Sequence, residues 1–308
     1  MMHRNGNQME VNGLFATLNT PEALKGEEIH GLPPYDPRPA YAVDEYPACP
    51  ENWMHGSSKA SSYFVPVEAG RGMWFDFTVN AHHKHHVAVV VSVQGINPIT
   101  GQKMTELCLE KYKDKCPVHD IDFQQDRFCP TCGYKWPGQN YIATTTGQSL
   151  WIDGFRNEKG EVRQYVISEE EASGVAAQLI GEDRVFAIGY AFYLSKKPKP
   201  EQPRPYLRTA CCSFGGGTQV MGYNGLESLS FNDSDAGPDM AMLEVAAGAK
   251  IQQEVGVDPE DIDFWETEPA GMIYVNYVPL KVAEKILAAG KREEAKDGFL
   301  NGLKVGNK

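Results

Sequence analysis

The sequence has no long hydrophobic run. No window approaches the roughly 18 uninterrupted apolar residues that a membrane-spanning helix needs. The first ten residues also lack the charged and then apolar layout of a signal peptide. We therefore expect a cytoplasmic protein that has no membrane partner.

Cysteine is scarce for a disulfide-stabilised protein. The chain has 7 cysteines in 308 residues, an odd number in a chain large enough to form its own hydrophobic core. This usage is typical of a reducing compartment, where thiols bind metals or are buried. A disulfide framework is therefore not expected.

Positive charge is also in short supply. There are 29 Lys and Arg residues against 41 Asp and Glu residues, which gives a net charge of −12. Such a chain repels a phosphate backbone unless its basic residues gather on one face, and the sequence shows no such gathering. The composition disfavours nucleic acid as a partner.

Helical periodicity is rare, and strand patterns occupy most of the chain. Apolar residues alternate over 73–79, and a continuous apolar run covers 87–93, which is typical of a strand buried on both faces. Further expected elements are strands at 63–67, 184–195, 206–214, 243–255 and 272–278, a hairpin over 149–168, a short helix at 169–181, and a helix at 280–289 that Gly290 ends. This pattern predicts a mainly β fold, either a β-sandwich or paired antiparallel sheets, with a small zinc-binding insert and a C-terminal helix.

The chain divides into four parts. Residues 1–60 are expected to form an extended arm rich in proline and tyrosine, because proline disfavours helices and central strands. The other parts are a β domain over 61–195 with the insert at about 108–140, a second β region over 206–290 in the same or a separate domain, and a flexible tail over 291–308. The aromatic residues of the arm indicate that it lies against a surface, either its own domain or a neighbouring subunit.

The insert contains two pairs of metal-ligand residues. Cys116 and His119 form a CxxH pair, and Cys129 and Cys132 form a CxxC pair. A gap of two residues lets both side chains of a tight turn point at one ion, and Gly133 suits the left-handed position that such turns need. Four soft ligands predict one tetrahedral, structural Zn²⁺, because no coordination position is left for water. Unrelated buried thiols are the alternative interpretation.

Residues 114–136 resemble zinc-ribbon and zinc-knuckle modules. They differ from a full-sized ribbon in the short loop between the two pairs, and Cys108 is an alternative for one of the ligands. Zinc ribbons often contact nucleic acid, and Tyr134 and Trp136 offer rings on which bases could stack. We expect these two rings to form the core of the insert instead, because acidic residues alternate with the basic ones around them.

Four histidines, His82, His83, His85 and His86, precede the apolar run at 87–93. A histidine pair on one face of a strand can chelate a catalytic metal, but a third ligand and a base would also be required. The simpler interpretation is a polar turn at the strand entry whose imidazoles bond the backbone or respond to pH.

Two other patterns do not meet their templates. Cys211 and Cys212 precede a glycine run but have no histidine nearby in the sequence, as a cysteine nucleophile would need. Asp233, Asp235 and Asp239 depart from the spacing of a Ca²⁺-binding loop, so we expect a solvated acidic loop.

The blocks WIDGFRNEKGEVRQYV at 151–166 and AAGAKIQQEVGVDP at 246–259 resemble segments of uncharacterised β-rich proteins, and this resemblance implies no activity.

Taken together, these patterns predict a non-enzymatic structural or assembly protein that forms a homo-oligomer through its N-terminal arm and has a zinc-stapled insert. Two alternatives stay open, a metal-dependent enzyme that uses the His82–His86 cluster and a nucleic-acid-binding zinc-ribbon protein.

Overall fold

A computed structural model describes residues 6–79, 84–104, 106–157, 160–169, 188–200 and 243–292. Its strands are β1 (Met9–Val11), β2 (Leu14–Asn19), β3 (Tyr41–Ala42), β4 (Ala60–Val67), β5 (Gly72–Val79), β6 (His85–Val93), β7 (Tyr141–Ala143), β8 (Trp151–Ile152), β9 (Gly154–Arg156), β10 (Val162–Ser168), β11 (Ile188–Pro198), β12 (Glu244–Lys250) and β13 (Gly271–Pro279). Short 3-10 helices cover Val43–Glu45, Glu51–Trp53, Gln125–Arg127, Thr144–Thr146 and Ile262–Phe264, and the α-helix α2 covers Leu280–Ala288.

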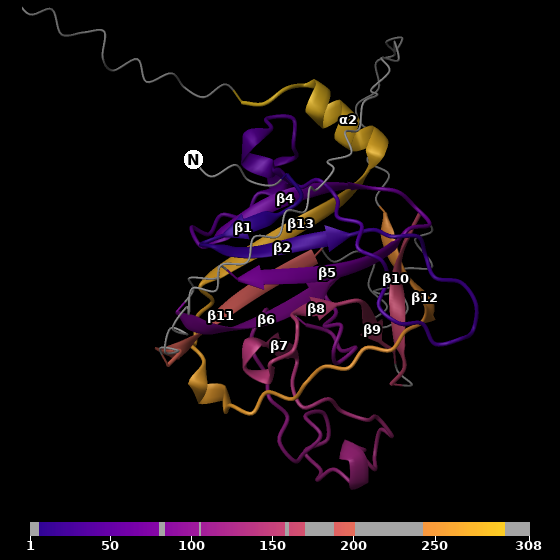
Figure 1. The fold of residues 1–308 in the computed structure, drawn as a ribbon, viewed down its shortest axis with the longest axis vertical. Coiled ribbons are helices and arrows are strands. Elements are labelled where there is room, and N and C mark those ends of the chain that lie inside the picture. The colour runs from indigo at the N-terminus through magenta and orange to yellow at the C-terminus, as the bar shows by residue number, and fades with distance from the viewer. Residues whose placement is uncertain are drawn as a thin grey trace, which may run out of the picture.

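The described strands form two sheets that pack face to face (Figure 1). One has seven strands in the order β1-β2-β5-β10-β12, with β8 also paired to β5 and β9 to β10. The other has six strands in the order β3-β4-β13-β11-β6-β7. The predicted mainly β fold with a C-terminal helix is confirmed. The pairing of β4 with β13 is parallel, whereas the other paired strands described are antiparallel.

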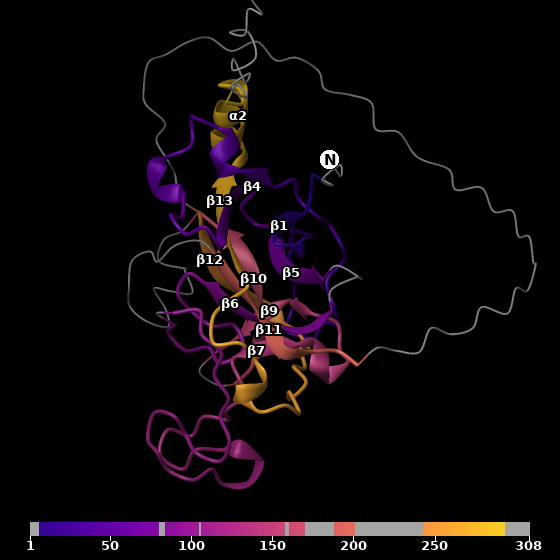
Figure 2. The same cartoon turned by 90° about the vertical axis from the view of Figure 1, so that its left-hand side faces the viewer.

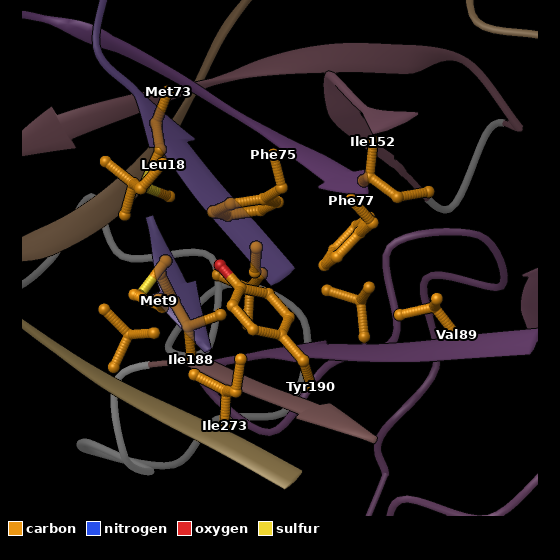
Figure 3. Close-up of a cluster of buried hydrophobic side chains, with 14 of the residues drawn as sticks. Met9, Leu18, Met73, Phe75, Phe77, Val89, Ile152, Ile188, Tyr190 and Ile273 are labelled. Atoms are coloured by element: carbon orange, nitrogen blue, oxygen red, sulfur yellow. The ribbon is translucent and has the colours of Figure 1, made fainter. Parts of the chain in front are cut away.

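The main hydrophobic core fills the space between the two sheets. Alternate residues of β5, including Phe75 and Phe77, point inward from one sheet and meet Tyr190 of β11 and Ile273 of β13 from the other (Figure 3). Side chains alternate between the two faces of a strand, so this inward set follows directly from the period of two in the sequence. Ile152 of β8 belongs to the same core.

The six-stranded sheet is also covered on its outer face. In β6, Val87, Val89 and Val91 enter the core between the sheets, while Ala88 and Val90 join a second buried cluster. That cluster includes Tyr141, Tyr193 and Trp265 from β7, β11 and the loop before β13. The predicted burial of the 87–93 run on both faces is therefore confirmed.

Helix α2 packs against the same outer face, near β4 and β13. Its apolar side chains Val282, Ala283 and Ile286 form one buried cluster with Phe64 of β4, and the chain turns away at Gly290 with φ of 85°. The predicted helix and its glycine stop are thus confirmed. No helix among the described residues is long and apolar enough to cross a membrane.

The N-terminal region differs from the predicted arm. β1 and β2 form a hairpin at the edge of the seven-stranded sheet, and Asn12 and Gly13 have the positive φ values of a tight turn. Asn-Gly between alternating apolar residues is a strong hairpin signal. The prolines of the residues that follow favour an extended arm, so the hairpin was not predicted. The proline-rich segment packs on the seven-stranded sheet of the same chain. Trp74 Nε1 of β5 donates to Pro34 O at 3.1 Å, and Tyr35 packs edge-on to Trp74.

The described C-terminal strands complete the two sheets of the same sandwich. β12 pairs with β10, and β13 lies between β4 and β11. The described part of residues 206–290, which begins at residue 243, therefore shares both sheets with the earlier strands. In the hairpin predicted over 149–168, β9 pairs with β10, whereas β8 pairs with β5.

Three expected elements lie wholly or mostly outside the described residues: the strand at 206–214, the helix at 169–181 and the tail at 291–308.

Candidate metal centre

The insert, at about residues 108–140, lies in the chain between β6 and β7, and the residues that lead into it, including Ile96 and Ile99, belong to the core between the two sheets. The insert projects from the end of the sandwich opposite α2 and carries no described strand of either sheet (Figures 1 and 2). Its own buried cluster, separate from the cores of the sandwich, contains Cys116, Cys129, Tyr134 and Trp136. A unit this small needs a further constraint to stay folded.

The first ligand pair lies in a tight turn. Cys116 N–H donates to Ile121 O at 2.9 Å, and Asp120 N–H donates back to Cys116 O at 2.8 Å. Asp120 has φ of 50°, a left-handed conformation that aspartate tolerates better than most residues. The turn therefore presents Cys116 and His119 on one side.

The second ligand pair repeats the same turn. Cys129 N–H donates to Tyr134 O at 3.0 Å, Gly133 N–H donates to Cys129 O at 2.9 Å, and Gly133 has φ of 66°. Each hydrogen bond joins positions equivalent to those in the first turn, and the left-handed residue comes at the same place. The predicted role of Gly133 is confirmed, and Asp120 takes that role in the first turn.

The two turns bring the four predicted ligands together. One ligand atom from each of Cys116, His119, Cys129 and Cys132 lies within 4.8 Å of all the others. His119 Nδ1 is 3.5 Å from Cys116 Sγ and 3.7 Å from Cys129 Sγ. Metal–sulfur bonds of about 2.3 Å place the sulfurs of a tetrahedral site about 3.8 Å apart, so this spacing suits one metal ion. Cys116 and Cys129 are buried and Cys132 is exposed.

The electrostatics of the cluster favour a cation. Burial raises the pKa of the Cys129 thiol, but hydrogen bonds from the backbone N–H groups of Cys132 and Thr131 and from the thiols of Cys132 and Cys116 together lower that pKa to about 6. Burial, Cys129 and the nearby Cys116 raise the pKa of Cys132. Like charges in one site oppose further ionisation, and a bound cation removes that opposition.

Aromatic side chains fill the space behind the ligands. Tyr134 and Trp136 are buried, and Trp136 packs edge-on to both Tyr134 and Tyr112, with ring centroids 5.2 Å and 5.3 Å away. Tyr134 Oη donates to Thr100 O at 2.5 Å and so ties the insert to the sandwich. The prediction that Tyr134 and Trp136 form the core of the insert is confirmed.

Arg127 joins the two ends of the insert. Its guanidinium donates to Lys113 O at 2.7 Å and Pro137 O at 3.1 Å, its Nε donates to Trp136 O at 3.1 Å, and a further contact reaches Tyr112 O. The guanidinium group is planar and carries several N–H donors, so it can bond several carbonyls at once. No sequence signal distinguishes Arg127 from the other basic residues of the insert.

The base of the insert is held by polar side chains that the sequence analysis did not identify. Asn140 Nδ2 donates to Cys108 O at 2.9 Å, and Asn140 Oδ1 accepts from Glu110 N–H at 2.8 Å. Lys111 Nζ donates to Asp258 O at 2.7 Å in the loop that precedes β13. The side chain of Asp258 is itself buried and accepts hydrogen bonds from Tyr141, Thr145 and Trp265 and from the backbone of Glu260.

The other predicted ligand candidates lie apart from this cluster. The Cys108 thiol contacts Glu106 rather than the four ligands, so it does not replace one of them. His85 Nδ1 bonds Ser195 O at 2.6 Å, and His86 Nδ1 lies 3.3 Å from Thr144 Oγ1. The bond to Ser195 O fits the interpretation of a polar strand entry. Burial and Lys199 lower the pKa of His86.

Several predicted candidates lie outside the described residues: His82, His83, Cys211, Cys212, Asp233, Asp235 and Asp239. Within the described ranges, the cluster of Cys116, His119, Cys129 and Cys132 is the one group of metal-ligand side chains close enough to share an ion.

Four basic side chains of the insert have partners within the chain. Lys113 pairs with Asp261 at 2.8 Å and Lys115 with Asp120 at 3.3 Å, while Arg127 and Lys111 bond backbone carbonyls. These contacts leave little concentrated positive charge to attract a phosphate backbone.

Comparisons with models of protein families, with curated proteins and with solved structures found no match. The fold and the site together define a β-sandwich whose small insert has a cluster of three cysteines and one histidine able to hold a metal ion.

Proposed function

We propose that the insert binds one Zn²⁺ through Cys116, His119, Cys129 and Cys132, and that this ion is structural. The observation that carries the proposal is the pair of equivalent turns, which direct four soft ligand atoms at one point. Three thiolates and one imidazole match the ligand preference of zinc and leave no position open for a reacting water.

The surroundings of the cluster support a structural role. The insert has a core of only a few side chains and a single arginine that joins its ends. Metal binding would supply the stability that such a small core lacks, because binding free energy becomes folding free energy in small metal-binding units.

The test is the metal content of the full chain after purification without added zinc. We expect about one zinc per chain, and a large loss of zinc in the double variant Cys129→Ser, Cys132→Ser. The matched control is Cys108→Ser, which changes an exposed thiol of the insert outside the cluster. Wild-type protein that holds no zinc, or equal loss of zinc in the control, would contradict the proposal.

We also propose that the protein is a non-enzymatic subunit that associates with itself. Three apolar side chains within one short stretch of the N-terminal segment, Ile29, Leu32 and Tyr35, are exposed. A contiguous patch of exposed apolar side chains is typical of an interaction surface, and we propose that these three form one. Because β1 to β3 belong to the sheets, self-association would use this surface rather than a free arm.

Light scattering of the full chain at high concentration tests this second proposal. We expect an oligomer that Ile29→Asp weakens. Val257→Asp, at an exposed valine in another part of the chain, is the control and should leave the oligomer unchanged. A monomeric wild-type chain would refute self-association.

A further inference from the structure

A cavity of about 470 Å³ lies apart from the Cys/His cluster. It is bounded by the segment from Ile142 to Asp153 and by the segment from Gln252 to Gly256, with Leu32 also on its wall. This volume is in the range of sites that bind small molecules. None of the four proposed metal ligands lines the cavity.

Asp153 is the unusual residue of this cavity. Its side chain is 2% exposed, and its Oδ1 is buried with no hydrogen-bond partner among the described residues. A buried polar atom without a partner costs free energy, and such an atom in a cavity is a candidate contact for a ligand. Burial also raises the pKa of this carboxyl to about 6, and no described salt bridge offsets the burial.

The backbone around Asp153 is fixed. The N–H groups of Asp153 and Gly154 donate to Gln253 Oε1 at 2.8 Å and 3.1 Å. A Cβ atom at Gly154 would lie 2.2 Å from Arg163 O, so the chain passes close to β10 at this point. These contacts hold the two walls of the cavity together and keep Asp153 in a defined position.

Trp151 and Asp153 both line the cavity, while Ile152 between them points into the core of the sandwich (Figure 3). Trp151 lines the cavity and is 40% exposed, a high value for a tryptophan. Its ring offers a face on which a cation or a methylene chain can pack.

The charge of the cavity is negative. Asp153 and Glu254 line it, whereas none of the described lining residues is a lysine, arginine or histidine. Anionic ligands are therefore disfavoured. An ammonium group would both donate a hydrogen bond to the carboxylate and compensate its charge.

We infer that this cavity binds a small organic cation, a primary amine whose ammonium group pairs with Asp153 and whose methylene chain packs on Trp151. This inference is independent of the zinc site, because the two sets of residues do not overlap.

Isothermal titration calorimetry on the full chain tests the inference, with cadaverine as the probe and pentanediol as its neutral analogue. We expect saturable binding of cadaverine and no binding of the diol. Asp153→Asn keeps the size of the side chain and removes its charge, so cadaverine should bind about tenfold more weakly or worse. Glu51→Gln, at an exposed acid outside the cavity, should bind cadaverine as the wild type does.

Three results would overturn the inference. They are the absence of saturable cadaverine binding to the wild type, equal binding to Asp153→Asn and Glu51→Gln, and equal binding of the diol and the diamine. Thermal unfolding of each variant shows that it is folded. A second variant, Trp151→Ala, should also weaken cadaverine binding, because it removes the exposed ring while the buried carboxyl stays in place.

Discussion

Asp153 shows how one residue can make stability depend on pH. Because burial raises the pKa of its carboxyl from 3.8 to about 6, the folded chain holds this proton more tightly than the unfolded chain. Proton binding to Asp153 therefore stabilises the folded state fully at pH below 3.8, and this stabilisation is lost as the pH rises through about 6. Above that value the folded state contains a buried charge.

We therefore predict that Asp153→Asn stabilises the protein at neutral pH. The displacement of the pKa from 3.8 to about 6 corresponds to about 3 kcal/mol of unfolding free energy. Chemical denaturation should show this gain at pH above about 7 and little gain at pH below about 4. A gain that is equal at both pH values, or a variant less stable than the wild type at neutral pH, would contradict this prediction.

Among single residues, the four members of the Cys/His cluster could be predicted from the sequence, but the residues that hold the insert in place around it could not. Cys116, His119, Cys129 and Cys132 stand out because two matched pairs with a short spacing are rare in a chain with few cysteines. Arg127 and Asn140 act through backbone carbonyls and amides that come from other segments of the insert. Such contacts depend on the folded path of the chain and have no local pattern.

The two ligand turns can be compared as elements, because they have the same hydrogen bonds but different residues at the left-handed position. The first turn has Asp120 there and the second has Gly133. A side chain at positive φ is strained, less so for aspartate than for most residues, and glycine has no such strain.

We predict that a substitution at Gly133 weakens zinc binding and that one at Asp120 does not. Asp120→Gly should leave zinc affinity unchanged or raise it, whereas Gly133→Ala should lower it, with a cost of about 1 kcal/mol from the left-handed backbone alone. Competition with a chromophoric chelator measures both affinities. If Gly133→Ala binds zinc as tightly as the wild type, the left-handed turn is not needed for binding.

The strands show where local patterns succeed and where they fail. The core strands β5, β6 and β13 were predicted, because a period of two or a continuous apolar run reports burial directly. The β1–β2 hairpin was not predicted, although Asn12 and Gly13 signal it, because the prolines of the residues that follow favour an extended arm. The parallel pairing of β4 with β13 has no local signal, because the two strands are far apart in the sequence.

At the scale of the whole molecule, the insert and the sandwich have separate cores. The buried cluster around Cys116 and Trp136 is distinct from the clusters between and outside the sheets. The two parts are joined by polar contacts, such as those of Tyr134 and Lys111, and by Leu109 at the base of the insert, which packs against the outer cluster of the sandwich. The stability of one part should therefore depend only weakly on the other.

We predict that a metal chelator unfolds the insert and leaves the sandwich folded. Hydrogen exchange measured by mass spectrometry should show faster exchange over residues 112–136 after chelation, because the small core loses its metal. Peptides from β6, β11 and β13 should exchange as slowly as before. Cooperative unfolding of these strands at the same chelator concentration would show that the two parts fold as one unit.

The neighbours of β13 have a consequence for the synthesis of the protein. This strand lies between β4 and β11 and follows both in the sequence, so the six-stranded sheet stays divided until the ribosome has made Gly271–Pro279. Until then, the nascent chain exposes one edge of β4 and one of β11, which are sites for incorrect pairing with other chains. A prematurely terminated product that lacks β13 would keep these edges permanently and should be recognised by cellular chaperones and proteases.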